Sequence, residues 1–138
     1  MKVTQVLLVS SLIAGLFFAQ DATARGAKPM IDPERVSFKC DLDSKQIRHA
    51  ITVAMTVLGW TATYTDDGVK GNIVVRGKHT LNVLVKYDPE SFDVNYTSSD
   101  NLKYKLKKGR PYIHANASSW MDNLKNGISA QLLSMDCN

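Results

Sequence analysis

The sequence predicts an α+β fold, a two-layer sandwich in which two helices cover one face of a four-stranded antiparallel meander. Three observations lead to this prediction. Apolar residues recur at helical spacing over residues 44–58 and again over residues 118–135, and between them apolar and polar residues alternate. Short turn signals divide the alternating stretch into strands. Because each helix has one apolar stripe and the sheet one apolar face, two layers bury all of these surfaces together.

The chain begins with a pattern typical of a secretory signal peptide. Lys2 supplies a short positive region, residues 6–19 are almost entirely apolar, and residues 22–24 (ATA) resemble a cleavage site. We therefore predict a signal peptide over residues 1–24, with export to the periplasm or secretion outside the cell. The alternative is a membrane anchor, but a span needs roughly 20 apolar residues and this stretch is shorter. No later stretch is long enough for a transmembrane segment.

The remaining chain is expected to hold a flexible leader followed by a single domain. Residues 25–38 contain Pro29 and Pro33 among several charges, which favours an irregular leader with a short extra strand near its end. Residues 39–138 then form one α+β domain of ordinary size. Cleavage removes Lys2 and Asp21 together, so the formal net charge stays at +4. A charge this small favours a local basic patch.

The helices carry capping and termination signals. Asp43 with Gln46 three residues later matches a capping box at the start of the first helix. Gly59 provides a left-handed stop at its end. The second helix is expected to be capped by a serine at position 118 or 119. Gly127 in its middle indicates either a close approach to a neighbouring element or a kink.

Four stretches have strand character. In three of them, residues 60–65, 81–87 and 92–97, the apolar members fall mainly on alternate residues, as expected for a sheet with one face toward the core and one toward water. Each is bounded by Gly, Asp, Asn or Pro, which have turn chemistry. The predicted strands are residues 60–65, 72–76, 81–87 and 92–97, with turns near Asp66-Asp67-Gly68, Gly77-Lys78-His79 and residues 88–91.

Three segments resemble one family. Leu58-Gly59-Trp60, residues 87–104 (YDPESFDVNYTSSDNLKY) and residues 113–124 (IHANASSWMDNL) are similar to small uncharacterised Gram-negative envelope proteins, periplasmic proteins and lipoproteins of unknown function. The resemblance implies the order helix, four strands, helix, and no known reaction. The chain departs from the pattern in three ways: it has no cysteine to lipidate after the signal sequence, it has Ala117 and Ser118 where the family often has tyrosine and asparagine, and the link between Tyr104 and Ile113 is longer and more basic.

The two cysteines, Cys40 and Cys137, lie near the two ends of the expected domain. In an oxidising compartment this predicts a disulfide between them. A metal site or a catalytic thiol is the alternative. Neither is favoured, because the sequence has no C-x-x-C and no histidine close to either cysteine.

Nothing in the sequence indicates catalysis, a metal or a cofactor. His49, His79 and His114 fall on different predicted elements and lack supporting ligands. The Asp pairs at 41/43 and 66/67 suit a helix start and a turn. No nucleophile elbow or phosphate-binding glycine loop occurs. The sequence therefore predicts that the protein is not an enzyme.

The best functional lead is the basic run KYKLKKGRPYIH, residues 103–114. Its lysines alternate with Tyr104 and Leu106, which would suit an edge strand protected by charge, followed by a turn at residues 108–111. The run is either a solvated loop or a surface for an anionic partner, an envelope protein, polymer or lipid; nucleic acid is not expected. The candidate partner-binding residues are Lys103, Lys105, Lys107, Lys108, Arg110, Tyr112 and His114.

Two functions follow from this lead. The first is a non-catalytic periplasmic protein that binds an envelope partner through the basic run or through the polar face of the sheet. The second is an inhibitor or immunity-type protein, in which the basic run blocks the acidic cleft of a secreted or cell-wall-acting enzyme. The oligomeric state and the identity of the partner stay open.

Overall fold

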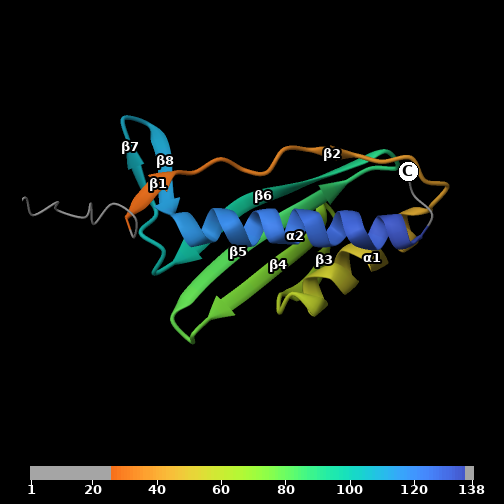
Figure 1. The fold of residues 1–138 in the computed structure, drawn as a ribbon, viewed down its shortest axis with the longest axis horizontal. Helices are drawn as coiled ribbons and strands as arrows, with labels where there is room; N and C mark the ends of the chain where they lie inside the picture. The colour runs from red at the N-terminus through yellow and green to blue at the C-terminus, as the bar shows by residue number, and fades with distance from the viewer. Residues whose placement is uncertain (1–25, 136–138) are drawn as a thin grey trace, which may run out of the picture.

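The computed structural model describes residues 26–135, which fold into two helices and eight strands (Figure 1). Strands β2, β6, β5, β4 and β3 form one antiparallel sheet in that order, and β1, β8 and β7 form a second, smaller one. In chain order the elements are β1 (Ala27–Pro29), β2 (Val36–Ser37), α1 (Ser44–Val57), β3 (Thr61–Thr65), β4 (Gly68–Val75), β5 (His79–Tyr87), β6 (Ser91–Asp100), β7 (Lys105–Lys107), β8 (Arg110–His114) and α2 (Ala115–Ser134).

The α+β class is confirmed, and the sheet differs from the prediction in size. The four predicted strands are present as neighbours β3 to β6, and the short extra strand expected near the end of the leader is present as β2, which pairs with β6 and makes the sheet five-stranded. The second sheet was not predicted. Both additions use residues 25–38, the expected flexible leader, because β1 pairs with β8 and β2 with β6. The leader therefore contributes backbone hydrogen bonds to both sheets.

Both helices pack on the same face of the large sheet, as predicted. Val69, Val83 and Val94 point to this face from three adjacent strands, and all three are fully buried. They share one core with the buried stripes of α1 and α2. The contact is close at Gly71, where an added Cβ would lie 3.1 Å from the Met55 methyl carbon on α1. Burial of each large side chain contributes about 1.5–3 kcal/mol.

The start of α1 matches the capping-box prediction, whereas α2 begins earlier than predicted. The Asp43 side chain accepts the Gln46 N–H at 2.9 Å, and the Gln46 side chain accepts the Asp43 N–H in return. In α2 the cap is His114, whose Nδ1 accepts the N–H of Asn116, so the predicted cap at 118 or 119 is wrong. The reason is packing, because Ala117 is fully buried and extends the apolar stripe by one turn.

Gly127 serves a close contact between the helices. An added Cβ would lie 2.8 Å from the Leu58 Cδ1 and 3.8 Å from the Ala54 Cβ, both at the end of α1. The missing side chain therefore lets α2 approach α1, which compensates for the roughly 1 kcal/mol that glycine costs inside a helix.

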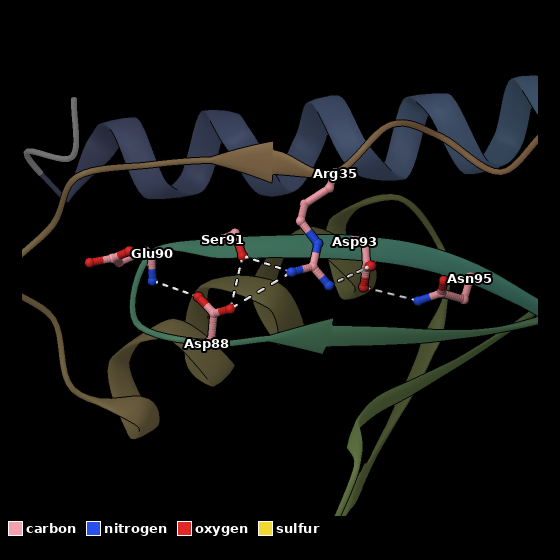
Figure 2. Close-up of polar contacts among 6 residues, drawn as sticks. All are labelled: Arg35, Asp88, Glu90, Ser91, Asp93 and Asn95. Atoms are coloured by element: carbon pink, nitrogen blue, oxygen red, sulfur yellow. Dashed lines mark hydrogen bonds and ion pairs between the residues drawn. The ribbon is translucent and has the colours of Figure 1, made fainter.

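Arg35 ties the segment before β2 to the large sheet (Figure 2). Its Nη2 donates to Asp93 Oδ2 at 3.0 Å, and its Nη1 lies 3.9 Å from Asp88 Oδ2. Asp88 also accepts the Glu90 N–H at 2.8 Å and the Ser91 hydroxyl at 3.0 Å. These contacts link two segments to each other. One is the tight turn between β5 and β6, and the other is the leader segment before β2.

The Asp88 carboxylate should give the fold a measurable acid sensitivity. Hydrogen bonds from the Glu90 N–H and the Ser91 hydroxyl lower the pKa of Asp88 below its ordinary value of 3.8. A lowered pKa means that the carboxylate stabilises the fold above its ordinary pKa and loses this effect as pH falls through the lowered value. We expect Asp88→Asn to melt below wild type at neutral pH. Melting curves recorded between neutral and acid pH should show the two Tm values converging below pH about 4; a constant difference would contradict this role.

Two sequence predictions lie outside the described residues. The first is the signal peptide over residues 1–24. The second is the disulfide between Cys40 and Cys137, because Cys137 is not among the described residues. Both stay predictions. Figure 1 shows the C-terminal end of α2 at the same end of the long axis as the segment between β2 and α1, which contains Cys40. Neither helix within residues 26–135 has the length and hydropathy that a membrane crossing requires.

Candidate functional site

The basic run forms a two-stranded hairpin that extends from one end of the molecule (Figure 1). Lys107 pairs with Arg110, so Lys108 and Gly109 are the only loop residues, with φ of 50° and 75°. Positive φ at both positions is the signature of a type I′ turn, whose twist matches that of the strands. The predicted edge strand is thus present as β7, and the turn ends at residue 109 instead of the predicted 111, because Arg110 and Pro111 belong to β8.

The hairpin places its cations and one tyrosine on a common face. Lys105 lies opposite Tyr112 and Lys107 opposite Arg110, and directly paired residues project to the same side of a ladder. The other side carries Leu106 opposite Pro111. We call Lys105, Lys107, Lys108, Arg110 and Tyr112 the basic face; its four cations are exposed, and a hollow of about 640 Å³ is lined by the last four of these residues.

In the part of the chain that the structure describes, the basic face has no acidic partner. Residues 101–114 contain no Asp or Glu. Within residues 26–135 none of Lys105, Lys107, Lys108 and Arg110 forms an ion pair, in contrast to Arg35, which contacts two aspartates. Lys107 and Arg110 lie directly opposite, and paired like charges destabilise a hairpin. The Lys107 Nζ lies 4.9 Å from the Tyr112 ring centroid, a cation–π contact that offsets part of this cost.

The base of the hairpin is held firmly. Ile113 is fully buried, and the His114 N–H donates to the Leu102 carbonyl at 2.8 Å. The Tyr104 ring stacks on Tyr96 of β6 with 4.9 Å between centroids. On the side away from β7, β1 pairs with the last three residues of β8, just before α2 begins. The cations therefore extend from an ordered support, which lowers the entropy cost of binding.

Two of the predicted site residues lie apart from the basic face. His114 caps α2 and lines a separate pocket beside the hairpin base. Lys103, with φ of 56°, precedes β7 and is exposed. Sequence reasoning missed the pocket because its lining comes from the β4–β5 turn, the segment before β7 and the start of α2, and no local motif joins them.

The polar face of the large sheet, the other predicted surface, is bonded to itself. Asn72 Nδ2 donates to Asn82 Oδ1 at 2.7 Å, and Asn82 Nδ2 donates to Ser98 Oγ at 3.0 Å. This ladder across β4, β5 and β6 uses the side-chain polar groups of these three residues within the sheet. The basic face, whose charges are uncompensated, is the stronger candidate site.

No known family model, curated protein or solved structure matches this chain. The resemblance to Gram-negative envelope proteins therefore stays a prediction from the sequence. Among the described residues, no group of three or more His, Cys, Asp or Glu side chains is arranged to hold a metal ion.

Proposed function

We propose that this is a non-catalytic exported protein that binds the anionic surface of envelope lipids through the basic face of the β7–β8 hairpin. The observation that carries the proposal is the gathering, on an ordered support, of four exposed cations that have no acidic neighbour among residues 26–135. Exposed lysines act as point charges, and Arg110 can donate two parallel hydrogen bonds to one phosphate. Phosphate oxygens would also relieve the repulsion between Lys107 and Arg110.

The apolar residues of the hairpin favour a lipid surface over an acidic protein. Leu106 is 64% exposed and Tyr104 is 42% exposed, although both are adjacent to lysines. Leu106 lies on the opposite side of the hairpin from the basic face, and basic residues on one face with apolar residues on the other are typical of segments that lie in a membrane interface. Near an anionic membrane each cation contributes about 1 kcal/mol.

The test is cosedimentation of the mature protein with vesicles. We expect binding to vesicles that contain phosphatidylglycerol and none to vesicles of phosphatidylcholine alone. Binding should weaken steadily as salt rises, because the Debye length falls from about 10 Å at 0.1 M to about 3 Å at 1 M. Equal binding to both vesicle types, or no binding at low salt, would refute the proposal.

An inhibitor of a secreted or cell-wall-acting enzyme is the second candidate. The observation that favours it is the shape of the hairpin, which extends away from the large sheet at one end of the molecule (Figure 1). A narrow basic projection suits an acidic active-site cleft. Capture of an envelope hydrolase at a salt concentration that abolishes vesicle binding would favour this function over the first.

A further inference from the structure

A pocket of about 560 Å³ lies at the base of the hairpin, apart from the basic face. It is lined by Val75, Arg76, His79, Leu102, His114, Asn116 and Trp120. One aromatic ring, two imidazoles, an amide and a guanidinium thus converge from three segments of the chain. Small-molecule sites commonly combine an aromatic wall with a few fixed polar groups in this way.

The two histidines are fixed in opposite hydrogen-bonding states. His79 Nδ1 lies 2.8 Å from the Asn101 carbonyl oxygen, which can only accept, so Nδ1 carries the proton and, in the neutral imidazole, Nε2 is left as an acceptor. His114 Nδ1 accepts the Asn116 N–H, so its proton is on Nε2, which is left as a donor. Backbone partners therefore give the pocket one acceptor and one donor of fixed identity.

The backbone around the pocket is held in an uncommon conformation. Arg76 and Asn101 both have φ of 56°, in the left-handed region that residues other than glycine rarely occupy. Arg76 lines the pocket, and Asn101 supplies the carbonyl that orients His79. Such conformations persist only where the surrounding structure enforces them, and they are frequent at ligand sites.

These groups suit a sugar better than an anion. A hydroxyl group both donates and accepts, so adjacent hydroxyls of a sugar ring can satisfy His79 Nε2 and His114 Nε2–H together. An inorganic anion would meet the lone pair of His79, which opposes it. The half-buried Trp120 ring can cover the apolar face of a sugar, and Arg76 can donate to further hydroxyls.

We infer that this pocket binds a neutral pyranose ring, with Trp120 against the ring and His79 and His114 bonded to its hydroxyls. The inference does not depend on lipid binding by the hairpin. An envelope contains glycans as well as lipids, so the two surfaces would recognise different components of one environment.

The experiment is a titration of the full mature chain, labelled with ¹⁵N, with maltotriose and with N,N′,N″-triacetylchitotriose. The chain has two tryptophans, and Trp60 is only 4% exposed, so its indole signal serves as an internal control. We expect at least one trisaccharide to shift the Trp120 indole signal saturably with Kd of about 1 mM. Trp120→Phe identifies that signal.

Matched variants make the test specific. His79→Phe removes the hydrogen-bond acceptor with a side chain of similar size and should weaken sugar binding about fivefold. The control is His49→Phe, on the exposed side of α1, which should leave sugar binding unchanged. If neither trisaccharide shifts Trp120 at ~10 mM, or if inorganic phosphate shifts it instead, the inference is overturned. A variant that lacks the hairpin cations should keep sugar binding, which separates this result from failure of the lipid proposal.

Discussion

Removal of four cations from the hairpin should reduce affinity for phosphatidylglycerol vesicles by about a thousandfold. At about 1 kcal/mol for each charge near an anionic surface, four charges contribute about 4 kcal/mol, and each 1.4 kcal/mol is a factor of ten. The variant combines Lys105→Ala, Lys107→Ala, Lys108→Asn and Arg110→Ala. Asparagine is chosen at 108 because Lys108 has φ of 50°, which Asn tolerates better than Ala does. The turn is therefore kept while its charge is removed.

The same variant should fold as well as wild type. The cation–π contact at Tyr112 is lost, but the repulsion between Lys107 and Arg110 is lost with it. Each effect is of the order of 1 kcal/mol or less, so Tm should change by only a few degrees. Circular dichroism melting curves measure this directly. A large fall in Tm would show that the cations are structural.

A second variant with the same loss of charge controls for net charge. It replaces by alanine four exposed lysines outside the hairpin and the pocket: Lys39, Lys45, Lys70 and Lys86. If the basic face is the site, the control retains most of the vesicle binding. Equal loss in both variants would mean that overall charge, and not the hairpin, attracts the protein to the membrane.

Gly68→Ala should be among the most destabilising single changes in the chain. Gly68 begins β4 with φ of +153°, and a Cβ there would overlap the carbonyl oxygen of Val85 in the neighbouring strand. Because that atom is backbone, it cannot move without disturbing the β4–β5 ladder. The unfavourable conformation and the steric overlap together should cost about 3 kcal/mol, a fall in Tm of roughly 15 °C.

Gly77→Ala is the matched control for this effect. Gly77 also has a positive φ, of +65°, but nothing lies within 4 Å of an added Cβ. The control should therefore cost only about 1 kcal/mol, the conformational part alone. Thermal melts of the two variants side by side give the comparison. Equal losses would show that the overlap at Val85 is relieved by a small shift of the strands.

Local patterns explain which elements could be predicted. The capping box at Asp43, the two-residue period of β3 to β6 and the Asp66-Asp67 turn are all contained in a few consecutive residues. The missed features depend on distant pairing. β1 is three residues long and contains Pro29, and it becomes a strand only because β8 lies beside it. The start of α2 was placed too late because serine is a common cap, whereas here His114 fills that role.

In the candidate site, too, local features could be predicted from the sequence and features that depend on the fold could not. The positive charge of the run could be read from the sequence, and so could the alternation that makes β7 a strand. The common face of Lys105, Lys107 and Arg110 depends on the two-residue turn, which sets the pairing register. The pocket could not be predicted, because His79 and His114 take their roles from the Asn101 carbonyl and the Asn116 N–H after folding.

The pairing of β1 with β8 determines how the protein should be attached to a surface or a label. Ala27 lies opposite His114, so anything joined just ahead of β1 would sit next to the central strand of the small sheet. The C-terminal end of α2 lies at the far end of the long axis from the hairpin (Figure 1). Immobilisation through the carboxyl terminus would present the lysine-bearing tip to solution, whereas an amino-terminal fusion would sit at the base of the hairpin, beside the start of α2.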